Sequence, residues 1–404
     1  MAGVVIIGAG QAGLQAAASA RDEGYDGEII LIGEEPFAPY QRPPLSKAYL
    51  KGEMDEEGLA LRGADFYAEA GMDLRTGVQV TAIDRAAKTI AFSNQTRLTY
   101  DKLVLAMGAQ NRPLNVPGVD LSGVMFLRGL TDAQAIKAAC VSGRHAVVIG
   151  AGFIGLEFAA VAVSKGLDVT VIEVAPRVMG RALSVPMSDF FAERHQVMGV
   201  KLRLGEGVRA IAGAEGQVTG VVLNSGETLP ADLVMIGVGV LPAIALAQAG
   251  GLETGDGVVV DATLRTLDPD IFAIGDLALH PNRFAPWPVR LESVQNAIDQ
   301  GRAVGATLAG RDSAYDKVPW FWSDQGPYKL QMAGLNMQAD QAVLRGDPAS
   351  ESFSVFLFRQ DSLIAVESVN KPVDHMAARR LLTLGVALSP AQAADEAFDL
   401  RRAT

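Results

Sequence analysis

Two stretches of sequence decide the fold: residues 4–13 read VVIIGAGQAG, and residues 146–155 read AVVIGAGFIG. Each starts with an apolar run suited to a buried parallel strand and then passes through three glycines into an Ala-rich helical stretch. A second apolar run follows in each case, at residues 28–32 and 169–172, and ends near an acidic residue. The spacing of the two copies is too wide for a solenoid. We therefore predict two βαβ units of the Rossmann type.

The glycines follow the spacing G-x-G-x-x-G, which is typical of a dinucleotide-binding turn. The first makes a tight turn, the second lets the backbone approach a pyrophosphate, and the third lets the helix pack on the strand. The helix N-terminus then faces the phosphates. The residues predicted to contact a cofactor in this way are Gly8, Gly10, Ala12 and Gly13 in the first unit, and Gly150, Gly152, Ile154 and Gly155 in the second.

Acidic residues follow the second strand of each unit, Glu34 in the first and Glu173 in the second. A carboxylate there can accept hydrogen bonds from ribose hydroxyls. The alternative is that Glu34 or its neighbour Glu35 is a solvated loop charge. In the second unit a carboxylate would repel the 2′-phosphate of NADP, so we predict NADH over NADPH. Arg177 and Arg181 leave three interpretations open: they accommodate a phosphate, pack over the adenine, or are solvated.

Composition narrows the class of protein. The chain has 404 residues, 49% of them hydrophobic, and 43 glycines, which suits an α/β enzyme of two or three domains. A net charge of -11 argues against a nucleic-acid binder. We expect no membrane span and a cytoplasmic location, since neither a long apolar stretch nor a signal peptide is recognisable. The single cysteine, Cys140, excludes the cysteine pair that disulphide reductases use.

Further strands are predicted at residues 100–107, 233–240 and 271–276. From about residue 317 the composition changes to aromatic residues and alternating strands, at 352–358 and 363–369. The predicted fold is therefore α/β, with two Rossmann-like dinucleotide-binding domains and a C-terminal α+β domain with an antiparallel sheet.

Longer motifs carry a resemblance to a known family. They read RPPLSK at residues 42–47, GLE at 155–157, VRLESV at 289–294 and WFWSDQ at 320–325. With IGD at 274–276 and the two glycine motifs, they resemble the glutathione-reductase-like flavoproteins that have two dinucleotide domains. Within that group the chain is similar to the putidaredoxin reductase family of oxygenase-coupled, NADH-dependent ferredoxin reductases. The similarity covers essentially the whole chain.

The resemblance implies an FAD-binding domain in two parts, 1–109 and 241–317, an NAD-binding domain at 110–240 and a C-terminal domain at 318–404. For FAD it adds Glu34, Arg42, Pro44, Lys47, Val80, Ala106, Gly108, Arg128, Gly275, Asp276, Val294 and Trp322 to the glycine motif. For NADH it adds Glu173, Arg181, Gly237 and Gly239. The family usually reads Ala-Thr-Gly where residues 106–108 read Ala-Met-Gly, so one supporting hydroxyl hydrogen bond is expected to be absent.

Lys47 and Glu157 are the residues that the resemblance implies in catalysis. A fixed ammonium beside the flavin stabilises the negative charge that arrives with the hydride, and Glu157 reaches toward that lysine. The alternative is an ordinary salt bridge between domains. Asp276 is implied to hydrogen-bond the FAD chain, with helix capping as the alternative.

Without a cysteine pair, electrons that arrive as hydride must leave the flavin singly. The implied acceptor is a small, acidic [2Fe-2S] ferredoxin that serves a cytochrome P-450 type monooxygenase or a ring-hydroxylating dioxygenase. Arg302 and Trp322 are implied in docking it; the alternatives are a solvated helix charge and core packing.

No metal site is expected, and the chain is expected to be a monomer or weak dimer. A rubredoxin reductase, or a non-enzymatic protein like apoptosis-inducing factor, is the alternative function. NADH oxidases and peroxidases are disfavoured because they need a catalytic cysteine in the first domain.

Overall fold

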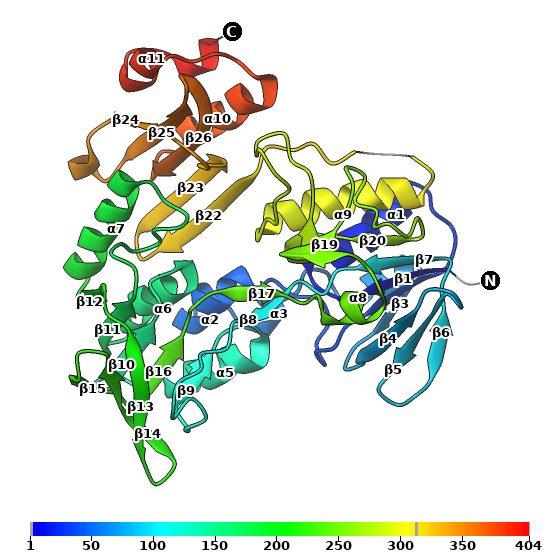
Figure 1. The fold of residues 1–404 in the computed structure, drawn as a ribbon, viewed down its shortest axis with the longest axis horizontal. Coiled ribbons are helices and arrows are strands. Elements are labelled where there is room, and N and C mark those ends of the chain that lie inside the picture. The colour runs from blue at the N-terminus through cyan, green and yellow to red at the C-terminus, as the bar shows by residue number, and fades with distance from the viewer. Residues whose placement is uncertain (1–2, 312–313, 404) are drawn as a thin grey trace. The chain divides into compact units, whose positions relative to one another are not determined.

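The computed structural model describes residues 3–311 and 314–403, which form two compact units (Figure 1). Unit 1 comprises Met1–Gln41, Glu57–Gln110 and Leu241–Phe321, and unit 2 comprises Arg42–Glu56, Asn111–Val240 and Trp322–Thr404. The chain leaves unit 1 within β8 (Ala109–Asn111) and returns within β17 (Val240–Pro242). Residues 42–56 lie inside the predicted first part of the FAD-binding domain, yet they pack with unit 2. The four domain boundaries stay a prediction.

A five-stranded sheet forms the centre of unit 1. Its order is β20-β7-β1-β2-β3, and all four neighbouring pairs are parallel. Apart from the edge strand β3 and Lys102 at the start of β7, the strands are apolar and buried, as expected of a sheet covered on both faces. Their bounds are β1 (Val4–Ile7), β2 (Ile29–Ile32), β3 (Met72–Arg75), β7 (Lys102–Leu105) and β20 (Ile271–Ala273).

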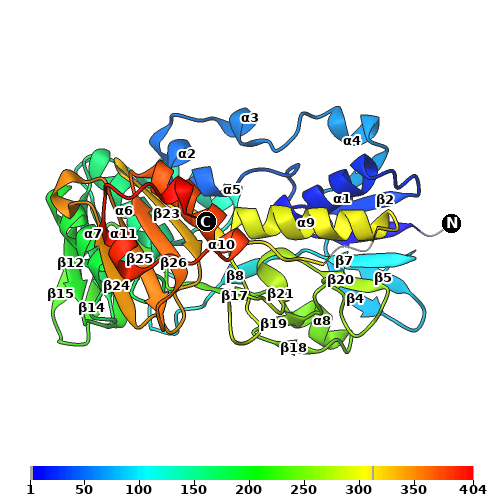
Figure 2. The same cartoon turned by 90° about the horizontal axis from the view of Figure 1, so that it is seen from above.

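Helices α1 (Gln11–Asp22) and α9 (Val294–Leu308) lie alongside one another in unit 1, as both views show (Figure 2). Glycines make this approach possible. A Cβ at Gly301 would come within 2.9 Å of the Ala12 carbonyl oxygen, and one at Gly305 within 2.5 Å of the Ser19 Cβ. The packing therefore brings α9, which is distant in sequence, against the helix of the first glycine motif.

The remaining elements of unit 1 are short. Two three-stranded sheets have the orders β4-β5-β6 and β18-β19-β21. The bounds are α3 (Glu56–Leu59), α4 (Phe66–Glu69), β4 (Val80–Asp84), β5 (Thr89–Phe92), β6 (Arg97–Thr99), α8 (Ala245–Ala249), β18 (Thr254–Gly255), β19 (Gly257–Val259), η2 (Gly275–Leu277) and β21 (Ala278–Leu279).

Unit 2 contains a second parallel sheet, with the order β12-β11-β10-β16-β9. A three-stranded antiparallel sheet, β13-β14-β15, accompanies it. The bounds are η1 (Pro43–Ser46), α2 (Ala48–Lys51), β9 (Val124–Phe126), α5 (Leu130–Ala139), β10 (His145–Ile149), α6 (Phe153–Ser164), β11 (Asp168–Glu173), α7 (Val185–Val197), β12 (Lys201–Leu204), β13 (Val208–Ala214), β14 (Gln217–Leu223), β15 (Thr228–Pro230) and β16 (Leu233–Ile236).

The C-terminal part of the chain forms a five-stranded sheet with the order β22-β23-β26-β25-β24. The pairs β23–β26, β25–β26 and β24–β25 are antiparallel. The bounds are β22 (Trp320–Gln325), β23 (Tyr328–Gly334), β24 (Gln341–Arg345), η3 (Pro348–Ser350), β25 (Phe353–Arg359), β26 (Ser362–Val369), α10 (Pro372–Leu384), α11 (Pro390–Ala394) and η4 (Leu400–Arg402).

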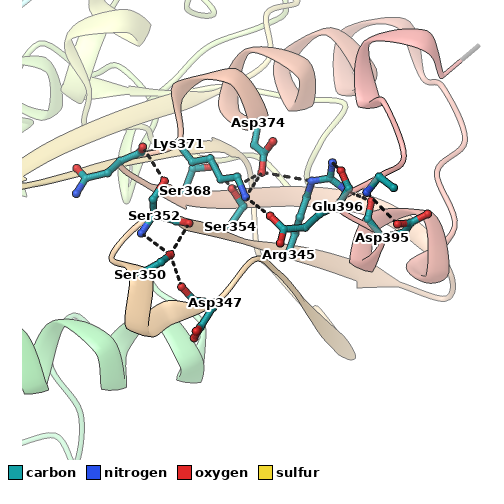
Figure 3. Close-up of polar contacts among 12 residues, drawn as sticks. Arg345, Asp347, Ser350, Ser352, Ser354, Ser368, Lys371, Asp374, Asp395 and Glu396 are labelled. Atoms are coloured by element: carbon teal, nitrogen blue, oxygen red, sulfur yellow. Dashed lines mark hydrogen bonds and ion pairs between the residues drawn. The ribbon is translucent and has the colours of Figure 1, made fainter.

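A buried arginine anchors the last segment of the chain (Figure 3). The guanidinium of Arg345, only 6% exposed, donates to the carbonyl oxygens of Ala393, Asp395, Glu396 and Phe398. Its Nε lies 3.5 Å from a carboxylate oxygen of Asp374. One side chain therefore donates to four backbone carbonyls at the end of α11 and in the segment that follows it.

The predicted α/β fold, with two Rossmann-like domains and a C-terminal α+β domain, is confirmed. Some strand bounds differ. The strand predicted at residues 233–240 ends at Ile236, because Gly239 adopts φ +99° and turns the backbone before β17 begins. The strand predicted at 100–107 is limited to Lys102–Leu105.

Candidate functional site

The three glycines of the first motif have the geometry that their spacing predicts. Gly8 adopts φ +114°, and a Cβ on it would lie 2.2 Å from the Ala106 carbonyl oxygen. A Cβ on Gly13 would lie 2.0 Å from the Gly8 carbonyl oxygen. A Cβ on Gly10, by contrast, would meet no atom of residues 3–311 and 314–403 within 4 Å. The first and third glycines are closed in by protein, while the second faces open space that a pyrophosphate can approach.

The helix that starts at this turn keeps its first amides available. Gly10 is the N-cap of α1, and no side chain caps the helix there. Unpaired N–H groups and the positive end of the helix dipole favour an anion at this position. Ala106 and Gly108, at the end of β7, lie in the same unit, and Gly108 also has positive φ, at +67°.

The loop after β2 carries the two glutamates whose roles were left open. Glu35 accepts a hydrogen bond from the Tyr40 hydroxyl at 2.5 Å, so its carboxylate is held within the loop. Glu34 is exposed and accepts a hydrogen bond from the Gln79 side chain at 3.0 Å. Gln79 directly precedes Val80, the first residue of β4, so the bond links the loop after β2 to the start of β4. Of the two side chains, Glu34 is therefore the more exposed.

The predicted residues from the second FAD segment pack against the first glycine motif. Gly275 has φ +73°, and a Cβ on it would lie 3.0 Å from the Ala12 Cβ. Its N–H donates to the Gln300 side-chain oxygen at 2.7 Å. Asp276 follows directly, and α9 begins at Val294. The sequence analysis did not predict a role for Gln300, which is fully buried. The only indication in the sequence was its position on the helix that follows the VRLESV motif.

The second glycine motif repeats this arrangement within unit 2. A Cβ on Gly150, at φ +105°, would lie 2.5 Å from the Gly237 carbonyl oxygen, and one on Gly155 would lie 2.2 Å from the Gly150 carbonyl oxygen. For a Cβ on Gly152, the only atom of the described residues within 4 Å is the Gly237 carbonyl oxygen, at 3.9 Å. Ile154, on the first turn of α6, is 37% exposed. This turn too is open at its second glycine.

Both carboxylate oxygens of Glu173 are held by backbone amides. One accepts from the Ala151 N–H and the other from the Ala175 N–H, each at 2.8 Å. The carboxylate is thus fixed beside the glycine turn, and each oxygen keeps a lone pair for another donor.

The two arginines after Glu173 differ. Arg177 donates to the carbonyls of Gly180 and Leu183, so it stabilises its own loop. Arg181 is exposed, and a Cβ on Gly239 would lie 3.4 Å from its guanidinium. The structure therefore brings Arg181 and Gly239 close together.

Lys47 and Glu157 form an ion pair within unit 2. The Lys47 Nζ lies 2.7 Å from the Glu157 Oε2, and the Glu157 side chain is only 5% exposed. Ser46 donates to the same oxygen at 2.6 Å, and Ser323 donates to the Oε1 atom at 2.5 Å. Neither serine was predicted, although each lies inside a motif that was, RPPLSK or WFWSDQ. Lys47 also donates to the Pro43 carbonyl oxygen at 3.1 Å.

The other residues predicted for FAD and for docking are spread over both units. Arg42 donates to the Arg128 carbonyl oxygen at 2.7 Å, which brings this pair together beside Pro44 in unit 2. Trp322 is half-buried in β22 and also belongs to unit 2. Arg302 lies on α9 in unit 1, where its side chain is 62% exposed and 3.6 Å from Asp299.

Two kinds of site find no support in the part of the chain that the structure describes. No group of three or more His, Cys, Asp or Glu side chains there could hold a metal ion. Burial raises the pKa of Cys140 to about 11, so its thiol is a poor nucleophile at neutral pH.

Among the residues that the structure describes, no helix has the length and hydropathy needed to cross a membrane.

Comparison with known proteins gives two family matches. Residues 2–301 match the pyridine nucleotide-disulphide oxidoreductase family, and residues 320–404 match the reductase C-terminal family. The rhodocoxin reductase of Rhodococcus erythropolis is 51% identical over 400 residues, which are 99% of this chain and 94% of that protein. The putidaredoxin reductase of Pseudomonas putida is 39% identical over 404 residues, with 98% and 96% coverage.

A solved structure is similar over the same length. The ferredoxin reductase for the CYP199A2 system from Rhodopseudomonas palustris has a TM-score of 0.97 and 46% sequence identity. The comparison covers 100% of this chain and 99% of that one.

Proposed function

Because the chain belongs to the pyridine nucleotide-disulphide oxidoreductase family, we propose that it is an NADH:ferredoxin reductase that serves an oxygenase. Electrons would pass from NADH through FAD, one at a time, to a [2Fe-2S] ferredoxin. The terminal enzyme would be a cytochrome P-450 type monooxygenase or a ring-hydroxylating dioxygenase. At the coarser level the chain is a flavoprotein oxidoreductase of the ferredoxin reductase type, with FAD and NADH as its cofactors.

The observation that carries this proposal is the pair of open turns at Gly10 and Gly152. In both motifs a Cβ would collide with backbone at the first and third glycines, whereas the second is free of such contacts. The residues present therefore fit two dinucleotides, and we assign FAD to the turn in unit 1 and NADH to the turn in unit 2. When bound, FAD accepts a hydride as an electron pair and gives the electrons up singly.

The protein's own groups would position these cofactors. In unit 1, the amides at the start of α1 would hold the FAD pyrophosphate, and Glu34 would accept the ribose hydroxyls. In unit 2, Glu173, fixed by two backbone N–H groups, would accept the ribose of NADH and repel a 2′-phosphate. The Lys47 ammonium, paired with Glu157, would stabilise the negative charge that hydride brings.

The single cysteine supports one-electron output to a protein partner. The sequence holds no second thiol with which Cys140 could form a disulphide relay. Arg302 is exposed on α9 and would pair with an acidic ferredoxin. A net charge of -11 opposes long-range attraction of such a partner, so the docking face must be locally basic.

A rubredoxin reductase is the second candidate, since the rubredoxin-NAD(+) reductase of Pseudomonas putida is 40% identical over 369 residues. These residues are 91% of this chain and 96% of that protein. The two functions differ only in the electron acceptor.

One assay separates them. Purified enzyme reconstituted with FAD is given NADH and either a [2Fe-2S] ferredoxin or a rubredoxin, with cytochrome c as the final reporter. We expect saturable, ferredoxin-dependent reduction of cytochrome c. Higher kcat/KM with rubredoxin would favour the second candidate, and no dependence on either carrier would overturn both.

A further inference from the structure

A chain of buried hydrogen bonds leads from Glu157 into the core of unit 2. The Ser323 hydroxyl lies 2.5 Å from the Glu157 Oε1, and the Gln325 Nε2 lies 3.3 Å from the Ser323 Oγ. The Gln325 Oε1 lies 2.7 Å from the His195 Nε2. Ser323 and Gln325 alternate with Asp324 along β22, so both point to the same face of the strand.

The direction of every bond in this chain follows from the carboxylate at its end. An ionised Glu157 can only accept, so the Ser323 hydroxyl must donate to it. The Ser323 oxygen then accepts from the Gln325 Nε2, which leaves the Gln325 Oε1 to accept from the histidine. His195 is therefore the Nε2–H tautomer. All the donors point toward Glu157.

This chain of hydrogen bonds does not reach the solvent-exposed surface. Ser323, Gln325 and His195 are each 0% exposed, and the buried His195 Nδ1 has no hydrogen-bond partner among the residues that the structure describes. Burial also lowers the pKa of His195, which keeps the ring neutral. A side-chain amide in the middle of the chain is a poor proton carrier, because passing a proton on would convert it to the imidic acid. The geometry therefore serves to hold a group in place rather than to conduct protons.

These hydrogen bonds hold the Glu157 carboxylate, which is one half of the Lys47–Glu157 pair assigned to hydride transfer. The Oε2 atom of Glu157 accepts from Lys47 and Ser46, while Oε1 depends on Ser323. With Ser323 absent, a buried carboxylate oxygen would lose its donor and the carboxylate could rotate. The Lys47 ammonium, which forms an ion pair with that carboxylate at 2.7 Å, would move with it. An ångström of displacement is enough to slow a reaction that depends on alignment.

We propose that Ser323, held in turn by Gln325 and His195, is the positioning residue that orients the Glu157 carboxylate and, through it, the Lys47 ammonium. The inference rests on the proposed role of the Lys47–Glu157 pair. It assigns a function in hydride transfer to the C-terminal strand β22, which contains none of the glycine motifs.

The test uses the holoenzyme and measures flavin reduction by NADH in stopped flow. Ser323→Ala removes the donor, and Ser323→Thr keeps it. Gln325→Met removes the amide with little change in volume. Ser188→Ala is the matched control, because Ser188 is equally buried in unit 2 but donates to the Val178 carbonyl oxygen, outside this chain.

We expect Ser323→Ala to slow flavin reduction about tenfold, with the KM for NADH changed less than about twofold. Ser323→Thr should restore the rate and Gln325→Met should slow it by a smaller factor. The control should reduce its flavin at the wild-type rate. The ¹⁵N spectrum of the imidazoles gives a readout that does not depend on activity, since the protein has only four histidines. His195 should show the neutral Nε2–H tautomer, and its Nε2 resonance should shift in Gln325→Met.

The outcomes separate this inference from the function on which it rests. If Glu157→Ala slows reduction but folded Ser323→Ala and Gln325→Met do not, the positioning role is wrong and the role of the pair stands. If Glu157→Ala itself leaves the rate unchanged, the proposed role of the pair fails first. Should Ser323→Ala not fold, the Gln325→Met rate decides.

Discussion

Glu367 on β26 accepts hydrogen bonds from both the backbone N–H and the hydroxyl of Ser184, which occupies the N-cap position of α7. The two residues are 183 positions apart in sequence, and the carboxyl group is 1% exposed. The C-terminal sheet thereby holds the loop that contains Arg177 and Arg181. The Asn336 side chain adds a second bond, to the Ala182 carbonyl oxygen at 2.7 Å.

This contact predicts a pH dependence of stability. Burial raises the pKa of Glu367 from 4.5 to about 7, against the opposing effects of Ser184, Asn336 and Arg177. The folded state therefore holds a proton that the unfolded state loses between about pH 4.5 and 7, so the free energy of unfolding falls as the pH rises through this window. A shift of this size corresponds to about 3 kcal/mol.

The measurement is urea unfolding at pH 5 and pH 8. Glu367→Gln, which stays neutral, should lose most of this slope and be the more stable protein at pH 8. Glu396→Gln is the control, because Glu396 is exposed and its hydrogen bond with Lys371 lowers its pKa instead. An unchanged slope in Glu367→Gln would show that the carboxyl group does not titrate in this range.

Lys47 and Glu157 should act as a unit in flavin reduction. Either alanine variant should slow reduction by NADH roughly 10- to 100-fold, since each removes a fixed charge near the transferring hydride. The double variant should be little slower than either single one. Lys51→Ala is the control, because Lys51 pairs only loosely, at 4.0 Å, with Glu53. Additive losses in the stopped-flow cycle would mean that the two residues act separately.

Gly10→Ala and Gly152→Ala should separate the two cofactors. Both glycines have backbone angles that alanine can adopt, and neither Cβ would clash with protein, so the fold should tolerate them. Gly10→Ala should weaken FAD binding at least about tenfold, because the methyl group occupies the space of the pyrophosphate. Gly152→Ala should instead raise the KM for NADH and leave the FAD content normal.

The control for these variants is Gly63→Ala, which is equally free of contacts and lies outside both motifs. Fluorescence titration of the apoprotein with FAD gives the affinity for FAD, and steady-state kinetics give the KM for NADH. Equal FAD affinity in Gly10→Ala and Gly63→Ala would contradict the assignment of unit 1 to FAD.

Glu173 predicts the choice of nicotinamide. The fixed carboxylate should make kcat/KM for NADH at least about 100-fold higher than for NADPH, because a 2′-phosphate would meet a negative charge. Glu173→Gln keeps the shape and removes the charge, so it should narrow that ratio. Equal efficiency with the two cofactors in the wild-type enzyme would overturn this prediction and favour phosphate recognition by Arg181.

Arg345 should stabilise the C-terminal segment without affecting electron transfer. Arg345→Met leaves four carbonyl oxygens without their donor and Asp374 without a nearby guanidinium. We expect a loss of about 2–4 kcal/mol and faster amide exchange at residues 386–403, with flavin reduction unchanged. Arg401→Ala is the control, since its side chain is 73% exposed. Wild-type exchange in Arg345→Met would show that packing alone holds the segment.

The sequence determined the parts of this protein that depend on local backbone chemistry. A strand, a glycine turn and a helix within ten residues specify their own geometry, so both glycine turns could be predicted, including the close contacts at Gly8 and Gly13 and the open position at Gly10. The single cysteine likewise excluded a disulphide relay by counting alone. The Lys47–Glu157 pair came from resemblance, because nothing local links two residues that are 110 positions apart.

Tertiary structure decided which polar groups meet. Ser46 and Ser323 lie 111 and 166 residues from Glu157, and no periodicity in the sequence connects them. The tertiary structure also decided that backbone amides hold both carboxylate oxygens of Glu173. It decided as well that Glu35, and not Glu34, accepts a hydrogen bond from the Tyr40 hydroxyl. The physical reason is the same throughout. A buried polar group takes its partners from whatever the folded chain brings beside it, and sequence spacing determines those neighbours only within a single strand, turn or helix.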